Sequence, residues 1–310
     1  MDIAFLGNFH VDYTSESHHA ATLTELGHTV HRLQEGKAQA SEILARAREA
    51  DLFVWVHTHG WRTPGMTQVV RTLKRAGVPT MTYHLDLWFG LRRQRDIKRT
   101  DPYWQLDHFF TADRLMAEWL SDNTSVHGHY LPAAVFHTEA TRVPPNARFD
   151  VAFVGSRPYH PEWPYRGQLI DWLTATYGDQ FRHYGNGGGW GIARGLDLNQ
   201  VYANARIVVG DSLCLNYSYP DYWSDRVYET LGRGGFLIHP TVPGIDNTFR
   251  DREHLVLYDY GDFDQLRDLI ASYLVHDEER NRIQQAGHDY VRTHHTYLDR
   301  WTQILSVVAR

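Results

Sequence analysis

The sequence lacks several features that mark particular classes of protein. It has a single cysteine among 310 residues, Cys214, which excludes an internal disulfide and a cysteine-rich zinc site. No apolar run approaches the roughly 18 residues that a membrane-spanning helix needs. Residues 1–7 lack the basic leader of a signal peptide. We therefore expect a cytoplasmic protein without a membrane span.

An excess of basic residues is also absent. The chain has 31 Lys and Arg residues against 37 Asp and Glu residues, and its formal net charge is −6. This balance argues against a general polyanion-binding protein. Rings, in contrast, are abundant: the chain has 10 Trp, 18 Tyr, 13 Phe and 20 His. Aromatic rings fill cores and also stack on sugars and bases, so composition alone leaves both roles open.

Short apolar runs and helical patterns alternate along the first part of the chain. Residues 2–7 are an apolar run that ends in glycine, which is typical of a buried strand. Further strands are predicted at 29–33, 51–57, 79–85 and 108–111. Helices are predicted between them at 17–26, 41–50 and 66–76. This alternation predicts a mainly parallel sheet with helices on both faces.

The alternation breaks at residues 141–146, where two prolines lie among polar residues, and it restarts with a strand and a glycine at 150–156. Later strands are predicted at 181–184, 206–209, 236–238 and 255–257, and helices at 167–177, at 224–232 and from 263 onward. We therefore predict an α/β protein with two Rossmann-like domains, 1–143 and 144–310, that face each other across a cleft. Ligands would bind beyond the carboxyl ends of the strands. The last helix is free to pack back on the N-terminal domain.

The most informative stretch is a predicted helix that begins after Ser224 and ends at Gly234 and Gly235, just before a buried strand. Free N–H groups and the dipole at the start of a helix favour a negatively charged ligand. Arg226 in the first turn adds donors suited to phosphate oxygens, and Glu229, one turn further on, suits a ribose diol. Together they indicate a nucleotide ligand. The alternative is that Arg226 and Glu229 form an i,i+3 ion pair on the surface.

This stretch, Ser224-x-Arg226-x-x-Glu229 followed by Gly-Gly and a strand, resembles the C-terminal domain of glycosyltransferases that have the two-Rossmann GT-B fold. The variety that it most resembles is the group 1, family-4-like type found in the spore-maturation CgeB-like family. Residues 254–258 and the closing segment 277–300 carry the same resemblance. The similarity covers roughly residues 150–305, and over 1–140 it depends mainly on architecture.

The resemblance implies roles for residues of the C-terminal half. Glu229 would hold the donor ribose, Arg226 the diphosphate, and the turn at 155–157 the phosphate or the sugar. Asp221 and Glu229 have the acid-x7-acid spacing of the retaining members, with Asp in place of the usual first Glu. The glycine-rich run at 185–191 is similar to the loop that passes the nucleotide base, and its alternative is a flexible surface loop.

Two larger sets of residues follow from these assignments. The donor site is predicted to comprise Gly7, Asn8, Gly155, Ser156, Arg157, Gly185, Asn186, Tyr222, Trp223, Ser224, Arg226 and Glu229. Eight rings in loops after strands or beside helix starts are predicted to stack on a base or a sugar: Trp88, Phe89, Tyr159, Trp163, Tyr165, Trp190, Tyr222 and Trp223. The expectation is strongest for Tyr222 and Trp223, which precede the donor helix.

Catalytic roles are predicted for His84, Asp86, His10 and Asp221. The stretch that ends in His84-Leu85-Asp86 is similar to the loop that meets the transferred sugar in such enzymes. This implies that His84 contacts a sugar hydroxyl or steadies developing charge, and that Asp86 orients His84 or binds the acceptor. The alternative is that these residues are polar strand ends in turns, and for His10 we prefer that explanation.

The basic block at 92–99 follows this loop. Arg92, Arg93 and Arg95 are predicted to bind a phosphorylated or polyanionic acceptor, nucleic acid included, and the alternative is a solvated helix face. No metal or other cofactor is predicted. The histidines of 57–59 and 127–129 are better explained as polar strand ends, and Asp262 and Asp264 as helix caps, than as metal ligands.

These observations predict a glycosyltransferase that moves a sugar from a nucleoside-diphosphate donor to an unidentified acceptor, which could be a glycan, a protein or a modified DNA base. The resemblance implies a retaining, metal-independent mechanism. One alternative is an inverting enzyme on the same fold with His10 or Asp86 as general base. A second is a non-catalytic protein that binds nucleotide sugars or DNA on a degenerate GT-B fold.

Overall fold

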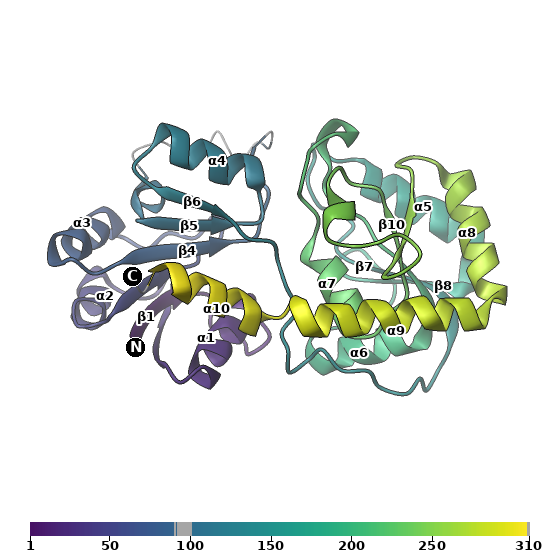
Figure 1. Ribbon diagram of the computed structural model, residues 1–310, viewed down its shortest axis with the longest axis horizontal. Coiled ribbons are helices and arrows are strands. Elements are labelled where there is room, and N and C mark those ends of the chain that lie inside the picture. The colour runs from purple at the N-terminus through teal and green to yellow at the C-terminus, as the bar shows by residue number, and fades with distance from the viewer. Residues whose placement is uncertain (90, 92–100, 309–310) are drawn as a thin grey trace. The chain divides into compact units, whose positions relative to one another are not determined.

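The computed structural model describes residues 1–89, 91 and 101–308 and divides the chain into two units (Figure 1). Unit 1 comprises Met1–Pro132 together with Tyr297–Arg310, and unit 2 comprises Ala133–Thr296. The chain therefore leaves unit 1 once and returns to it at its C-terminal end.

Unit 1 contains a six-stranded parallel sheet in the order β2-β1-β3-β4-β5-β6. Its elements along the chain are β1 (Asp2–Gly7), α1 (Ser15–Glu25), β2 (Thr29–Gln34), α2 (Ala40–Ala47), β3 (Leu52–Trp55), α3 (Met66–Ala76), β4 (Thr80–His84), the 3-10 helix η2 (Pro102–Gln105), β5 (His108–Thr111), α4 (Arg114–Asn123), β6 (His127–Tyr130) and α10 (Tyr297–Val308).

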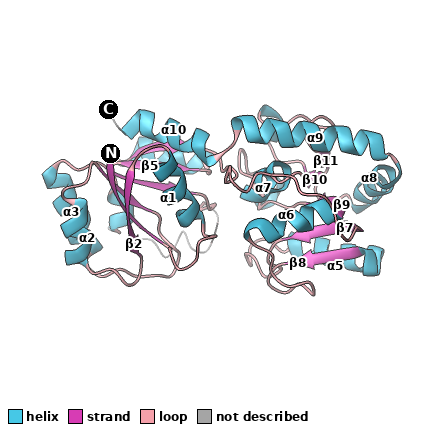
Figure 2. Cartoon of the chain, turned by 90° about the horizontal axis from the view of Figure 1, so that it is seen from below, coloured by secondary structure: helices cyan, strands magenta, loops and turns pink. Residues whose placement is uncertain are grey.

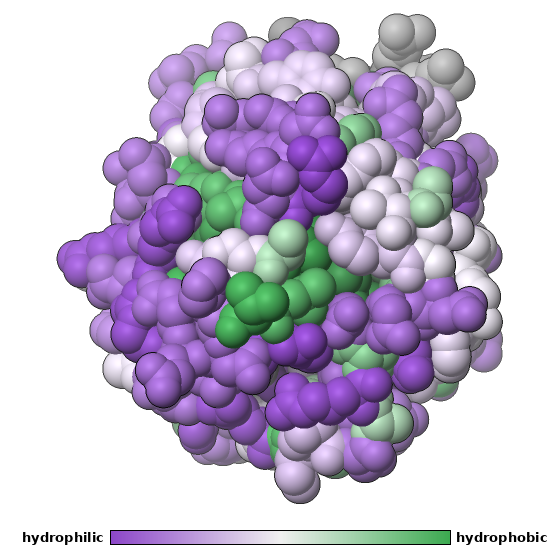
Figure 3. All heavy atoms as spheres, turned by 90° about the vertical axis from the view of Figure 1, so that its right-hand side faces the viewer, coloured by the Kyte–Doolittle hydropathy of each residue, from purple (hydrophilic) through white to green (hydrophobic). Residues whose placement is uncertain are grey.

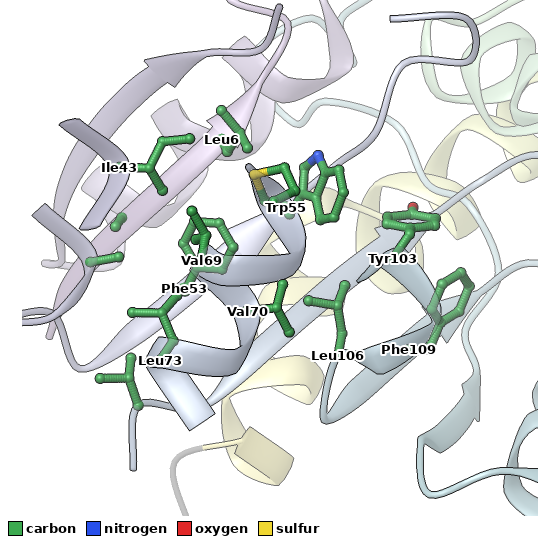
Figure 4. Close-up of a cluster of buried hydrophobic side chains, with 14 of the residues drawn as sticks. Leu6, Ile43, Phe53, Trp55, Val69, Val70, Leu73, Tyr103, Leu106 and Phe109 are labelled. Atoms are coloured by element: carbon green, nitrogen blue, oxygen red, sulfur yellow. The ribbon is translucent and has the colours of Figure 1, made fainter. Parts of the chain in front are cut away.

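Helices cover both faces of this sheet because its central strands are apolar on both sides. On one face, α2 and α3 bury Ile43 and Val69 against strand residues such as Phe53 (Figure 4). On the other face α10 packs beside α1, and Trp301 Nε1 donates a hydrogen bond to His19 Nδ1 at 3.1 Å. The core of unit 1 therefore includes the C-terminal helix.

Unit 2 contains a five-stranded parallel sheet in the order β11-β10-β9-β7-β8 (Figure 2). Its elements are β7 (Phe149–Val154), α5 (Tyr165–Tyr177), η3 (Gly178–Gln180), β8 (Phe181–Tyr184), α6 (Gly195–Asn204), β9 (Ala205–Val209), η4 (Leu215–Tyr217), α7 (Asp225–Gly232), β10 (Leu237–Pro240), η5 (Ile245–Asn247), β11 (Val256–Tyr258), α8 (Phe263–Val275) and α9 (Asp277–His294).

Each sheet has a point where the strand order reverses. In unit 1, β1 lies between β2 and β3, and in unit 2, β7 lies between β8 and β9. The loops that follow these strands diverge and leave a crevice at the carboxyl edge, which is where open parallel sheets bind ligands. The topology therefore directs attention to the loops after β1 and β3 and after β7 and β9.

Every strand predicted from an apolar run is present, whereas three α-helices or strands of the described residues were not predicted, and neither were the short 3-10 helices. The three are α4, β6 and α6. The strand β6, with the sequence His-Gly-His-Tyr, is a polar edge strand and has no apolar run. The helix α6 begins with a glycine, and α4 begins shortly after β5 with Asp113 as its N-cap.

The crossing between the units lies at Pro132–Ala133, before the two prolines that were predicted to mark it. The segment around those prolines packs on unit 2 instead. The side-chain amide of Asn199 donates hydrogen bonds of 2.9 Å to the carbonyl oxygens of Glu139 and Thr141. These bonds fix the segment to α6, so it does not act as a free linker.

The surface view shows a mainly hydrophilic face interrupted by a narrow apolar strip (Figure 3). Within the described part of the chain, no helix is long and apolar enough to cross a membrane.

Candidate functional site

The start of α7 is built as the sequence predicts, with Ser224 as its N-cap. Ser224 Oγ accepts a hydrogen bond from the backbone N–H of Arg226 at 3.2 Å. The backbone N–H of Ser224 in turn donates to Ser212 Oγ at 2.9 Å. The first turn of α7 is therefore tied to the loop that follows β9.

Ser212 belongs to a hydrogen-bonded chain that the sequence did not reveal. His239 Nδ1 lies 2.7 Å from the carbonyl oxygen of Pro240, and its Nε2 lies 2.9 Å from Ser212 Oγ. Since a carbonyl oxygen can only accept, Nδ1 carries the proton and Nε2 accepts from the Ser212 hydroxyl. Burial lowers the pKa of His239 to about 4, so the ring stays neutral. This chain fixes the cap of α7 to β9 and β10.

Arg226 and Glu229 form the i,i+3 ion pair that was the alternative explanation for their spacing. About a quarter of each side chain stays exposed, 26% for Arg226 and 22% for Glu229. Burial alone would lower the pKa of Arg226, but Glu229 and Asp225 together hold it above its usual value. The ion pair does not exclude a role for Arg226 in ligand binding. A guanidinium has five N–H donors, and the bond to Glu229 uses only some of them. Arg226 also lines a small pocket of about 10 Å³ beside Asp211 and His239.

Asp211 follows β9 at the point where the strand order of unit 2 reverses, and it was not predicted as a site residue. Its buried carboxylate accepts hydrogen bonds from Trp163 Nε1 at 3.2 Å and from Arg166 Nε at 3.1 Å. Burial raises the pKa of Asp211, and Arg166 and Trp163 offset part of that rise. The only sequence signal was an acidic residue one position after the run Val208-Val209-Gly210.

The loops after β7 and β8 meet at two glycines. A Cβ on Gly185 would lie 2.3 Å from the carbonyl oxygen of Gly155, so only glycine fits there. Beside them, the backbone N–H of Arg157 donates to the carbonyl oxygen of Asn186 at 2.8 Å, and the Ser156 carbonyl accepts from Arg166 Nη1 at 3.4 Å. The structure thus brings five predicted donor residues together: Gly155, Ser156, Arg157, Gly185 and Asn186.

Asp221 has a left-handed backbone with φ of 53°, and its N–H donates to the carbonyl oxygen of Pro243 at 2.8 Å. Its carboxylate lies against Gly244, where an added Cβ would be 2.2 Å from Asp221 Oδ1. The structure therefore holds the first acid of the acid-x7-acid pair against the loop before η5.

The stacking role predicted for Tyr222 and Trp223 is wrong, because both rings are buried, each with 4% of its surface exposed. Trp223 Nε1 donates to the Tyr228 hydroxyl at 2.9 Å, and its ring packs edge-on against Phe249. The same correction applies to three more of the eight rings, which are also buried: Trp88, Trp163 and Tyr165. These residues lie next to strand ends or helix starts, as predicted, but their rings point into the cores and not toward a ligand.

The other three rings are partly or largely accessible. Tyr159 lies under the Arg166 guanidinium, 3.9 Å from the ring centre, and Trp190 lies under that of Arg182 at 4.2 Å. Trp190 is about half exposed (51%), and Phe89 packs partly against the core of unit 1. Tyr159 and Trp190 keep the predicted place in the loops after β7 and β8.

In unit 1, the loop after β1 holds Gly7, Asn8 and His10. The Gly7 carbonyl accepts from the backbone N–H of Glu35 at 2.8 Å, and the Asn8 side chain accepts from the His10 backbone N–H at 3.3 Å. His10 is exposed, and its ring meets the edge of Trp61 with 5.6 Å between ring centres. Within residues 1–89, 91 and 101–308, no hydrogen bond orients the His10 imidazole.

Glu35, after β2, was missed by the sequence reasoning and is a buried carboxylate with three polar partners. It accepts hydrogen bonds from Trp55 Nε1 at 2.8 Å and from the Thr58 backbone N–H at 2.7 Å, and His57 Nδ1 lies 2.5 Å from its Oε1. This pairing explains His57 as the polar strand end that was predicted. His57 also lines a cavity of about 940 Å³ formed by the loop after β3 and by Asp101 and Pro102.

A second buried carboxylate, Glu16, lies in the first turn of α1. Burial raises the pKa of Glu16 to about 7, and the charges of Glu35 and Asp86 add to the rise. The backbone N–H groups of Glu16 and Asn8 offset part of it. The carboxyl edge of this sheet therefore gathers three acidic groups, of which only Asp86 was predicted.

His84 and Asp86 differ in their surroundings. His84 is buried, its Nδ1 lies 3.2 Å from the Tyr103 hydroxyl, and its ring packs among Trp88 and Phe109. Asp86 is exposed. The predicted contact of His84 with a sugar hydroxyl is therefore not supported by the orientation of its ring within the aromatic core, whereas Asp86 is accessible.

The remaining predictions concern the acceptor and metals. Arg92, Arg93 and Arg95 lie outside the described residues. Asp262 caps α8 as predicted, because its side chain accepts from the Gln265 backbone N–H at 2.8 Å. Across residues 1–89, 91 and 101–308, no group of three or more His, Cys, Asp or Glu side chains is placed to hold a metal ion.

Comparisons with known proteins agree with this architecture. Residues 166–306 match the model of a glycosyl transferase-like family. Among curated proteins, none matches the sequence. Among solved structures, an α-glucosyltransferase in complex with UDP-glucose and DNA containing an abasic site is similar over 100% of both chains, with a TM-score of 0.74 and 9% identity.

Two further structures show the same likeness. Anabaena Alr3699/HepE in complex with UDP and glucose has a TM-score of 0.64 at 11% identity, over 100% of this chain and 99% of that one. A glycosyltransferase from Rickettsia africae has a TM-score of 0.59 at 11% identity, over 100% and 98%. The two parallel-sheet units therefore have the predicted GT-B fold. The prediction of a glycosyltransferase-type enzyme is confirmed at the level of family model and fold.

Proposed function

We propose that the protein transfers a sugar from a UDP-sugar to an acceptor and that unit 2 holds the donor. One observation carries this proposal: the Ser224-capped start of α7 holds Arg226, partly exposed, near Asp211 and His239 at the carboxyl ends of β9 and β10. A capped helix start with a guanidinium is suited to a diphosphate. The solved structures of the same fold that contain UDP or UDP-glucose support the choice of nucleotide.

The chemistry follows from this geometry. The diphosphate gains negative charge as the glycosidic bond breaks, and Arg226 with the free N–H groups of α7 would stabilise that charge. Glu229 orients Arg226 through their ion pair and keeps oxygens for the ribose hydroxyls. The closely packed Gly155 and Gly185 let backbone approach the nucleotide. On this proposal no metal is needed, and the reaction is retaining, as in the CgeB-like glycosyltransferases that the sequence resembles.

The acceptor is assigned to unit 1. Its cavity of about 940 Å³ is lined by rings and by a cation, among them His57, Trp61 and Arg62, and this lining suits a sugar or a base. Arg92, Arg93 and Arg95 remain proposed contacts for a phosphorylated or polyanionic acceptor. The single cysteine of the chain supports a reducing, cytoplasmic compartment.

Calorimetry with UDP and GDP tests the donor site. Arg226→Ala removes charged hydrogen bonds to the diphosphate, so we expect UDP affinity to fall at least about tenfold. Arg250→Ala is the matched control, because Arg250 and Glu253 also form an i,i+3 pair in unit 2. If Arg226→Ala binds UDP as tightly as the control does, the donor site is not at α7.

Product stereochemistry tests the mechanism. Anomeric NMR that shows retention supports the proposal, and inversion would favour a base such as Asp86 or His10. Slow hydrolysis of UDP-glucose without an acceptor would exclude the non-catalytic alternative. If the protein binds UDP-sugars or GDP-sugars but hydrolyses none of them, the result would favour the non-catalytic alternative.

A further inference from the structure

Unit 2 has a second cavity, of about 350 Å³, at the end of α7 that is opposite to the donor site. Its walls come from the segment that follows the crossing between units, from the end of α7 and from α9, and they include Arg142, Arg148, Arg233, Gly234 and Gln284. Arg148 directly precedes β7, and Gly234 precedes β10. The cavity therefore lies at the amino ends of the strands, whereas the donor site lies at their carboxyl ends.

Arg233 lines this cavity although it is buried, with 3% of its surface exposed. Its guanidinium pairs with Glu139 and donates to the Gly195 carbonyl at 2.8 Å and to Asn199 Oδ1 at 2.5 Å. Its Nε–H is buried and has no hydrogen-bond partner within the described part of the chain. An unsatisfied buried donor on a cation costs free energy unless a ligand supplies an acceptor.

Two more guanidinium groups meet at the same cavity. Arg142 donates to the uncharged Gln285, and among the described residues neither Arg142 nor Arg148 forms an ion pair with a carboxylate. Gly234 has φ of 79°, and an added Cβ would lie 2.3 Å from Arg142 Cγ. The absence of a side chain at Gly234 therefore lets the Arg142 stem lie directly on the backbone at the cavity wall.

The charges leave this cavity strongly positive. Arg233 faces two carboxylates, Glu139 and Glu229, the second of which it shares with Arg226, and the end of α7 contributes about half a negative charge. The positive charge of the cavity therefore comes from Arg142 and Arg148. The nearby side chains of Asn281 and Gln284 are uncharged. The volume is at the lower end of the range for small-molecule sites, which suits a compact ligand.

We propose that this cavity binds a phosphate group, either as inorganic phosphate or on a small phosphorylated molecule. Arg142 and Arg148 supply the exposed charges and donors, and the buried Arg233 adds a third guanidinium at the cavity wall. Phosphate oxygens match the forked donors of arginine, and a phosphate can accept from more than one guanidinium at once. The site is independent of the donor site and of the proposed transfer reaction.

The test compares the whole protein with Arg142→Gln/Arg148→Gln. Both side chains are exposed, so the double variant should fold. Titration calorimetry and thermal shift with inorganic phosphate, at constant ionic strength, should show binding to the wild type and at least about tenfold weaker binding to the variant. Arg250→Gln/Arg252→Gln removes two exposed arginines elsewhere in unit 2 and should bind phosphate as the wild type does.

Further arms separate the possible results. Tighter binding of glucose 6-phosphate than of phosphate would identify a phosphorylated small molecule as the ligand, and the reverse would identify phosphate itself. The double variant should keep its affinity for UDP, whereas Arg226→Ala should keep its affinity for phosphate. Absence of phosphate binding to the wild type, or equal binding by the double variant, would overturn the proposal. Loss of UDP and phosphate together in the double variant would also overturn it, because the two sites would not be separate.

Discussion

His57 Nδ1 lies 2.5 Å from Oε1 of the buried Glu35 carboxylate, which Trp55 and Thr58 also bind. Three donors converge on this one desolvated carboxylate, so the loss of any of them would leave a buried polar group unpaired. Both oxygens of Glu35 accept hydrogen bonds, so a glutamine at this position would place its NH₂ group against one of these donors.

Glu35→Gln is therefore expected to lower the free energy of unfolding by about 1–3 kcal/mol. Urea unfolding at neutral pH measures the change. Glu49→Gln serves as the control, because Glu49 is exposed in the loop after α2 and the change should be close to neutral. Equal stability of the two variants would show that the three bonds to Glu35 contribute little.

The stability of the protein should depend on pH through Glu16. The pKa of Glu16 is about 7 in the folded chain against an ordinary value of 4.5, so between these values the folded chain keeps a proton that the unfolded chain releases. This contribution to stability is present below 4.5 and is lost as pH rises through 7. The loss is on the order of 3 kcal/mol.

Urea unfolding of the wild type and of Glu16→Gln across this range checks the effect. The variant should lose this part of the pH dependence and should be the more stable protein above neutral pH. Glu118→Gln, at an exposed position of α4, should leave the pH profile unchanged. A profile of Glu16→Gln that matches the wild type would assign the dependence to another group.

Gly185→Ala should disturb the loops after β7 and β8. The added methyl would lie 2.3 Å from the Gly155 carbonyl oxygen, and the backbone must move to relieve the clash. We expect a loss of about 1–3 kcal/mol in stability and weaker UDP binding. Gly189→Ala is a control in the same loop, because an added Cβ there has no atom within 4 Å. Similar UDP affinity in both variants would remove Gly185 from the donor site.

The ion pair between Arg166 and Asp211 should contribute far more than the pair between Arg157 and Asp171. Asp211→Ala leaves the nearly buried Arg166 without its counter-charge, at a cost of about 3–5 kcal/mol. Asp171→Ala breaks an exposed pair, at a cost of about 0–1 kcal/mol. Thermal or urea unfolding of the two variants gives the comparison. Equal losses would contradict the view that burial decides the contribution of these pairs.

Much of the fold could be predicted because strands of a parallel sheet are buried on both faces, and a run such as residues 151–154 is apolar throughout. The edge strand β6 could not be predicted, because its sequence is polar and only its pairing with β5 identifies it as a strand. The N-cap Ser224 was predictable from its local sequence. The crossing at Pro132 was not, since the contacts that fix the following segment come from Asn199, far along the chain.

Site residues that lie in glycine turns or at helix starts could be predicted from the sequence. Buried acidic residues that are held by distant donors could not. Gly155 and Gly185 were assigned to the donor through the family resemblance of the loops in which they lie, and the structure brings their backbones together. Glu35 and Asp211 are single acidic residues in ordinary stretches, and only their donors from distant positions set them apart. Trp223 was misplaced, because the sequence around a ring does not show whether it points into the core or away from it.

The contribution of α10 to unit 1 has a consequence for the order in which the chain can fold during its synthesis. Trp301 is fully buried against α1, so the core of unit 1 stays incomplete until the end of the chain has left the ribosome. Unit 2 is one continuous stretch that is already synthesised by then. The N-terminal unit is therefore the last of the two to be completed, and shortening the chain before α10 would expose its core.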